Sequence, residues 1–60
     1  MTSKELERLI TKVGWQFTRQ KGSHRTYVHK NFNHIITIPF HKGDLKQGTL
    51  NSILKDAGLK

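Results

Sequence analysis

Hydrophobic residues recur with two different periods along this 60-residue chain, and the order of the periods restricts the fold more than any other feature. Near each end, the apolar residues return every three or four positions, as on one face of an α-helix. Between the ends they alternate with polar residues, as in a strand with one buried face. The chain is therefore expected to form a helix, then strands, then a second helix.

The first helical pattern covers residues 2–13. Its apolar stripe consists of Leu6, Leu9, Ile10 and Val13. Thr2 and Glu5 have the spacing of a capping box, in which each side chain bonds the backbone amide of the other residue. Gly14 follows, and glycine commonly ends a helix because it accepts a positive φ.

The central pattern predicts three strands joined by two turns. The expected strands are residues 15–20, 24–29 and 34–39, and the expected turns are residues 21–23 and 30–33. In the third strand, Ile36 and Ile38 would point into the core. Pro39 would end that strand or mark its edge, because proline has no backbone N–H to donate.

The burial of the other two strands is predicted from their aromatic residues. Trp15 and Phe17 alternate with polar residues, so we expect a half-buried strand with both rings pointing at the helices. In the second strand, alternation alone does not choose a face, and we place Tyr27 inward. This choice leaves His24 on the open side of the sheet, near its edge.

A second helical pattern follows a loop at residues 40–47 and begins at Gly48 or Thr49. Its stripe consists of Leu50, Ile53, Leu54 and Ala57, and Gly58 would end the helix. We therefore predict one α+β domain, residues 1–60, with the order α-β-β-β-α. Its three-stranded antiparallel sheet would carry two helices on one face and leave the other face open.

Positive charge dominates the middle of the chain. Eleven Lys and Arg residues face four Asp and Glu residues, for a net charge of +7, and no acid occurs from residue 13 to residue 43. The cations of this span are Arg19, Lys21, Arg25, Lys30 and Lys42. A surface of one sign is typical of proteins that bind a polyanion. We predict nucleic acid rather than a membrane, because the chain has no amphipathic basic helix of the membrane-surface kind.

No sequence feature directs the chain into a membrane or out of the cell. The residues after Met1 do not form a signal peptide, because no apolar segment follows their charge. No apolar run approaches the length that spans a bilayer. The expected location is the cytoplasm.

Few residues are suited to hold a metal or a cofactor. The chain has no cysteine, which excludes disulfides and thiolate metal sites. Its four histidines lie five, five and seven residues apart, so no two of them share one helical turn as zinc ligands often do. We expect no metal and no small-molecule cofactor. His29 and His34 are expected to be solvated basic positions.

Residues 21–25 combine groups that would hold a phosphate and move a proton. Gly22 allows a tight turn with close backbone approach, and successive N–H groups in such a turn can bind an anion. Lys21 and Arg25 add positive charge, and His24 carries an imidazole that titrates near neutral pH. The turn is therefore a candidate phosphate site with a proton-transfer group. The alternative is an ordinary hairpin turn in which His24 only starts a strand.

Several segments, in order and over nearly the whole chain, resemble the HicA toxin family. They are Gly14-Trp15, Lys21-Gly22-Ser23-His24-Arg25, Thr37-Ile38-Pro39-Phe40-His41, Gly48-Thr49-Leu50 and Ile53-Leu54-Lys55-Asp56-Ala57-Gly58-Leu59. The resemblance implies a fold similar to a double-stranded-RNA-binding domain. It also implies a toxin that cleaves messenger RNA and is neutralised by a HicB antitoxin encoded beside it. The catalytic histidine of the family falls on His24, and the histidine after its proline–aromatic pair falls on His41.

RNA cleavage suits these residues because the 2′-hydroxyl of RNA is itself the nucleophile. A base must take the 2′ proton, cations must stabilise the charge around phosphorus, and an acid should protonate the leaving 5′-oxygen. His24 is the candidate base or acid. The phosphate would be held by Lys21, Arg25 and the backbone amides near Gly22 and Ser23.

Two questions stay open from the residues alone. The second proton-transfer group is His41, His29 or water, and we expect His41 at least to contact the RNA. The function itself has two rivals, namely an RNA-binding module without catalysis and a subunit that only binds another protein. A binding module would keep its affinity after His24→Ala, whereas a nuclease would lose turnover.

Overall fold

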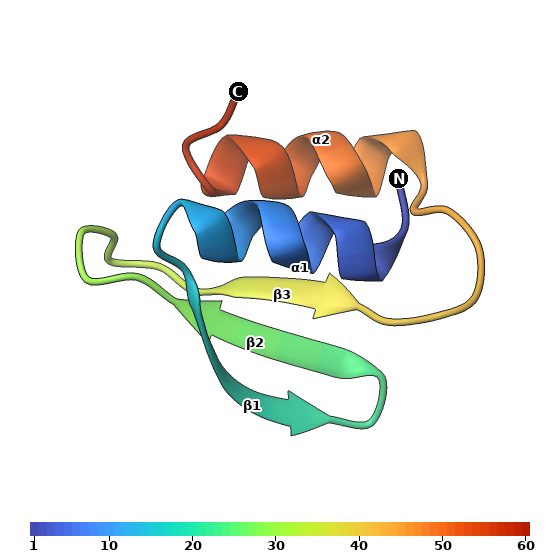
Figure 1. Cartoon of the computed structure of the whole chain (residues 1–60), viewed down its shortest axis with the longest axis horizontal. Helices are drawn as coiled ribbons and strands as arrows, with labels where there is room; N and C mark the ends of the chain where they lie inside the picture. Colours follow the sequence, from blue (N-terminus) through green and yellow to red (C-terminus); the bar gives the residue numbers. More distant parts are fainter.

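The computed structural model describes all 60 residues and contains five regular elements. They are α1 (Ser3–Lys12), β1 (Gln16–Lys21), β2 (His24–Val28), β3 (Ile36–Pro39) and α2 (Gln47–Asp56). The predicted order α-β-β-β-α is confirmed (Figure 1). Neither helix has the length or the apolar content that crossing a membrane requires.

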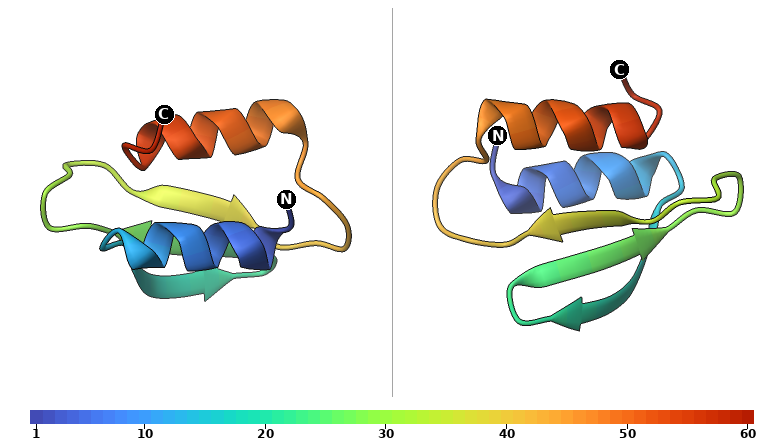
Figure 2. Two further views of the ribbon diagram at one scale, coloured as in Figure 1. Left: turned by 45° about the horizontal axis from the view of Figure 1, so that its top comes forward. Right: turned by 180° about the vertical axis from the view of Figure 1, so that it is seen from behind.

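The strands form one antiparallel sheet in the order β1-β2-β3. Tyr27 of β2 pairs with Phe17 of β1 and with Ile36 of β3, so these three side chains share one face of the sheet. Both helices contribute to the core on this face, and the other face is left open (Figure 2). The fold is α+β, as predicted.

Both ends of α1 follow from the local sequence. The Thr2 hydroxyl accepts a hydrogen bond from the Glu5 amide at 3.2 Å, and Glu5 Oε1 accepts one from the Thr2 amide at 2.8 Å. The predicted capping box is therefore confirmed. After the helix, Gly14 has a φ of +106°, which glycine adopts at little steric cost. The helix is one residue shorter at each end than the predicted residues 2–13.

The start of α2 has no capping signal in the sequence. The helix begins at Gln47, and the residue before it, Lys46, makes no side-chain cap hydrogen bond. The segment before α2 is tied to the N-terminus instead. The Leu45 amide donates to the Met1 carbonyl at 2.8 Å, and Asp44 Oδ1 lies 3.6 Å from the Met1 amino group.

Nine buried hydrophobic side chains form the core. They are Leu6, Ile10, Trp15, Tyr27, Ile36, Ile38, Leu45, Ile53 and Ala57. The inward orientation of Tyr27, Ile36 and Ile38 confirms the faces predicted for β2 and β3. Trp15 is also buried, and its indole N–H donates to the Ala57 carbonyl at 3.4 Å, so its predicted core role is confirmed.

β1 is exposed along its whole length, which the sequence did not indicate. The strand was expected to be half-buried, but Phe17 is 51% exposed although it is on the same face as Tyr27. Both helices pack on β3 at the opposite edge of the sheet, and β1 lies farthest from α2 (Figure 1). The prediction that β1 is half-buried is therefore wrong, although Phe17 is on the predicted face of the sheet.

The loop between β2 and β3 packs around Trp15. The Phe32 ring lies 4.9 Å from the indole, and the rings of His29 and His34 lie at 5.2 Å and 5.7 Å, measured between centroids. A ring nitrogen of His29, Nε2, also lies 2.9 Å from the Val13 carbonyl oxygen. His29 is thus partly buried, with its ring held by these contacts, whereas His34 is exposed as expected.

Candidate active site

The turn that precedes His24 has the geometry that its sequence requires. Lys21 pairs with His24 across the hairpin, so Gly22 and Ser23 alone form the connection. Gly22 has a φ of +58°, and every residue of the chain with a positive φ is a glycine. A two-residue hairpin turn of type II′ needs a positive φ only at its first central position. The sequence Gly22-Ser23 supplies it there.

His24 lies on the open face of the sheet, as predicted. It is the first residue of β2 and is exposed. Its cross-strand partner is Lys21, so both side chains emerge on the same face. Each of the other three histidines has a ring nitrogen within hydrogen-bond distance of a backbone carbonyl. His24 has no such contact, and neither of its ring nitrogens has a hydrogen-bond partner.

Arg25 points to the opposite face, because neighbouring residues in a strand alternate. Its Nη1 lies 2.9 Å from Glu7 Oε2 of α1, and its guanidinium carbon lies 4.4 Å from the centroid of the Phe40 ring. The structure therefore gathers Lys21, Gly22, Ser23 and His24 in one turn. It does not bring Arg25 to the phosphate position that was expected beside His24.

Glu7 accepts hydrogen bonds from two groups of β2. The Tyr27 hydroxyl and the Arg25 guanidinium both donate to Oε2 of Glu7. Burial acts to raise the pKa of the Glu7 carboxyl, but the two hydrogen bonds outweigh it and hold the pKa below its ordinary value. Burial and the same carboxylate raise the pKa of the Tyr27 hydroxyl. The ionised form of Glu7 therefore stabilises the contact between α1 and β2.

The lowered pKa of Glu7 predicts a pH dependence of stability. A carboxyl whose folded pKa is depressed contributes stability above its unfolded pKa, near 4.5, and loses it as pH falls through the folded pKa. We expect Glu7→Gln to lose roughly 1 kcal/mol at pH 7, because the ion pair is partly exposed and screened by solvent. The variant should also lose less stability than the wild type between pH 5 and about pH 2.

Thermal unfolding at a series of pH values measures this difference. Asp56→Asn is the matched control, because Asp56 forms no ion pair in the structure. The control should keep the wild-type pH dependence. A Glu7→Gln variant that follows the wild-type curve would contradict the assigned role of the carboxylate.

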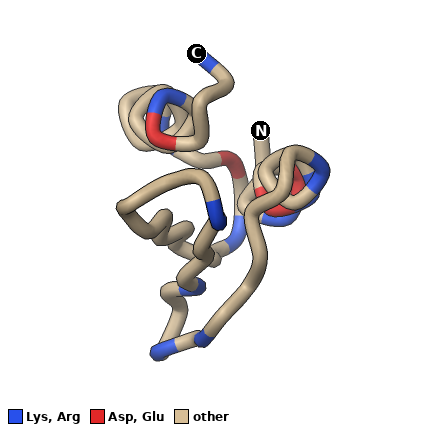
Figure 3. Tube along the Cα trace, turned by 90° about the vertical axis from the view of Figure 1, so that its left-hand side faces the viewer, with Lys and Arg blue, Asp and Glu red and all other residues tan.

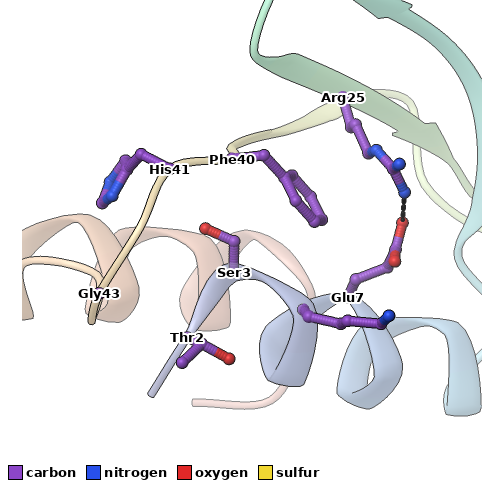
Figure 4. Close-up of a pocket in the computed structure, with 8 residues that line it drawn as sticks. Thr2, Ser3, Glu7, Arg25, Phe40, His41 and Gly43 are labelled. Carbon is purple, nitrogen blue, oxygen red and sulfur yellow. Dashed lines mark hydrogen bonds and ion pairs between the residues drawn. The ribbon is translucent and has the colours of Figure 1, made fainter.

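His41 lies in a cleft of about 350 Å³ between the start of α1 and the loop after β3. Figure 4 shows Ser3, Glu7, Arg25 and Phe40 around this cleft, with the imidazole of His41 pointing away from the Arg25–Glu7 pair. A ring nitrogen of His41, Nδ1, lies 3.0 Å from the carbonyl oxygen of the adjacent Lys42.

The loop that carries His41 begins directly beside the His24 turn. The Phe40 amide donates to the Ser23 carbonyl, at 2.6 Å, and His24 pairs with Pro39 in the sheet. The structure thus brings the segment of His41 next to the turn that contains His24. The cleft that His41 lines is also lined by Arg25, whose side chain is on the face of the sheet opposite His24.

The sheet carries cations without acids. Figure 3 shows Asp and Glu only on the helices and the segment before α2, whereas Lys and Arg also mark the strands. Arg19 pairs with Thr26, so its side chain is on the same open face as Lys21 and His24. The open face therefore carries positive charge from Arg19 and Lys21 and no acid. No three His, Asp or Glu side chains of the chain gather closely enough to hold a metal ion.

Sequence reasoning missed the residues that surround Arg25. They are Glu7, Gln20, Tyr27 and Phe40. Glu7 had one signal, because its position on the helix lies beside Leu6 and Ile10 of the buried stripe. Such a marginal position indicates partial burial, and a partly buried carboxylate requires a partner.

The chain matches a sequence-family model over residues 3–59, and the model is described as the HicA toxin of bacterial toxin–antitoxin systems. The protein is thus a toxin of the toxin–antitoxin class. It belongs to the HicA toxin family.

A solved structure described as a HicA3 and HicB3 toxin–antitoxin complex is similar to this fold. The TM-score is 0.78 and the sequence identity is 34%, over 100% of this chain and 97% of that chain. No curated protein matches the chain significantly in sequence. The family expected from the sequence motifs is confirmed.

Proposed function

We propose that this toxin arrests translation by cleaving messenger RNA without a bound metal, with His24 as its central catalytic residue. The observation that carries the proposal is the position of His24. Its exposed imidazole lies beside Lys21 at the tight turn, on a sheet face that has cations and no acids. The site of action is the cytoplasm, because messenger RNA is translated there.

The reaction uses the 2′-hydroxyl of the RNA as the nucleophile. His24 takes the 2′ proton, the 2′-oxygen forms a bond to the adjacent phosphorus, and the bond from phosphorus to the 5′-oxygen breaks. Lys21 stabilises the negative charge that develops on the phosphate oxygens, and the backbone amides of the Gly22-Ser23 turn contribute further. The leaving 5′-oxygen then takes up a proton from an acid or from water.

His41 is a better candidate for that acid than His29. Both ring nitrogens of His29 already have partners, because Nδ1 accepts from the Asn31 amide at 3.0 Å and Nε2 lies against the Val13 carbonyl. His41 is exposed, and its loop starts beside the His24 turn. We propose that His41 contacts the RNA and that His41 or water protonates the leaving oxygen.

We propose a HicB antitoxin as the protein partner. The net charge of +7 favours an acidic partner that covers the open basic face. The HicA3 and HicB3 complex supports this choice, because a chain of that complex matches this one at 34% identity. Binding of such a partner would also stabilise a small domain whose core has nine buried side chains.

Cleavage of a defined messenger RNA by the purified protein in excess EDTA tests the proposal. We expect cleavage in EDTA, and we expect an equimolar amount of HicB to stop it. RNA binding without cleavage, both with purified RNA and in a cell-free translation reaction, would contradict the nuclease assignment. That result would favour an RNA-binding module without catalysis.

A further inference from the structure

Two hydrogen bonds hold the turn before His24 by its carbonyl oxygens. Gln20 Nε2 donates to the Gly22 carbonyl at 2.9 Å. The Phe40 amide donates to the Ser23 carbonyl at 2.6 Å. The turn belongs to the exposed part of the sheet, and the His24 imidazole has no hydrogen-bond partner of its own. The position of His24 therefore depends on the backbone of this turn.

The two residues that donate, Gln20 and Phe40, both contact Arg25 through their side chains. Its Nε donates to Gln20 Oε1 at 3.1 Å, which orients the Gln20 amide so that its NH₂ group faces Gly22. Its guanidinium carbon lies over the Phe40 ring, at 4.4 Å from the centroid. A lysine at this position could not make the same contacts, because its single ammonium group cannot reproduce the rigid, planar fork of donors of arginine.

Glu7 anchors Arg25 to α1. Its Oε2 lies 2.9 Å from Arg25 Nη1 and also accepts from the Tyr27 hydroxyl. The carboxylate holds the guanidinium charge, and its hydrogen bond raises the pKa of Arg25. A continuous path of polar contacts thus runs from the first helix through Arg25 and Gln20 to the Gly22 carbonyl.

We propose that Glu7, Arg25 and Gln20 are positioning residues for His24. They act through the turn and do not touch the RNA. The proposal rests on the nuclease function proposed above and gives Arg25 a role other than phosphate binding. A misplacement of about 1 Å at a reacting group can cost a hundredfold in rate. Fixing the turn would therefore act on turnover rather than on RNA affinity.

Gln20→Met tests the proposal without changing the charge of the protein. The substitution keeps the length of the side chain and removes both of its hydrogen bonds. We expect kcat for RNA cleavage to fall by about tenfold to a hundredfold, with KM within about twofold of the wild type. Gln20 is exposed, so the melting temperature should stay within a few degrees.

Gln16→Met is the matched control. Gln16 is an exposed glutamine of the same strand, and it pairs with Val28 at the end of the hairpin away from the turn. We expect this variant to cleave RNA at the wild-type rate. Arg25→Lys, which keeps the charge, should reproduce the loss of kcat seen in Gln20→Met.

Amide hydrogen exchange gives a readout that does not depend on RNA cleavage. The Phe40 amide is bonded to Ser23 and therefore reports on the turn. We expect its exchange to be about tenfold faster in Gln20→Met and unchanged in Gln16→Met. Unchanged exchange would overturn the inference, as would faster exchange with an unchanged kcat. An inactive wild type would instead overturn the proposed function, and the exchange data would still show whether Gln20 holds the turn.

Discussion

Replacing His24 by alanine is expected to lower the rate of RNA cleavage by about a hundredfold to ten-thousandfold, the range over which a general acid or base contributes to catalysis. The imidazole is the only proton-transfer side chain of the turn, and neither of its ring nitrogens has a hydrogen-bond partner. Affinity for RNA should change little, because Lys21, Arg19 and the turn backbone are retained. The fold should also be retained, since His24 is exposed.

The measurement is cleavage in EDTA under single-turnover conditions, with RNA binding and thermal unfolding measured on the same preparations. His41→Ala is the parallel variant, because His41 is also exposed and its loop begins beside the turn. We expect it to retain more activity than His24→Ala, since water can replace an acid more readily than a positioned base. Equal cleavage by wild type and His24→Ala would contradict the catalytic role assigned to His24. An inactive His41→Ala variant beside an active His24→Ala variant would move the base to His41.

The order of elements is predictable from the sequence because each boundary has a local cause. The capping box of Thr2 and Glu5 starts α1, Gly14 ends it, and Gly22 turns the chain between β1 and β2. These signals involve residues within three or four positions of one another. The start of α2 has no such signal, because the side chain of Lys46 does not cap the helix. The predicted start, at Gly48 or Thr49, therefore falls after the observed start at Gln47.

The burial of β1 is not predictable in this way. Alternation shows that Phe17 and Tyr27 share a face, but it does not show how far the helices extend across that face. Both helices pack on β3, so β1 remains uncovered. This arrangement depends on contacts between elements that are distant in sequence, such as the hydrogen bond between Trp15 and Ala57.

The candidate site also has a part that local sequence predicts and a part that depends on distant contacts. The turn from Lys21 to His24 is local, and the sequence places it correctly. The separation of Arg25 from His24 also follows from strand alternation, but the ion pair with Glu7 joins residues 18 positions apart. No local pattern specifies this partner. The site is therefore a local turn whose support comes from α1 and from the loop that contains Phe40.

Gly14→Ala is expected to destabilise the fold by about 2 to 3 kcal/mol. A side chain at a φ of +106° is strained, which costs roughly 1 to 2 kcal/mol. The new Cβ would also lie 2.5 Å from His29 Nε2, so the ring must move away from the Val13 carbonyl, at a cost of about 1 kcal/mol for that hydrogen bond. A domain of this size has a total stability of roughly 3 to 9 kcal/mol. The melting temperature should therefore fall by about 10 to 20 °C.

Alanine variants of two other glycines separate the cost of backbone strain from the cost of the collision with His29. Gly22 has a positive φ of +58° with open space around its Cβ position, so Gly22→Ala should show the strain alone and lose about 1 kcal/mol. Gly48 lies in α2 with neither a positive φ nor a close neighbour, so Gly48→Ala should be neutral or gain up to about 1 kcal/mol. If Gly14→Ala melts at the same temperature as Gly22→Ala, the contact with His29 contributes nothing. If Gly14→Ala melts at the same temperature as Gly48→Ala, neither backbone strain at position 14 nor a collision with His29 destabilises the variant. The expected order of melting temperatures, Gly48→Ala above Gly22→Ala above Gly14→Ala, requires both.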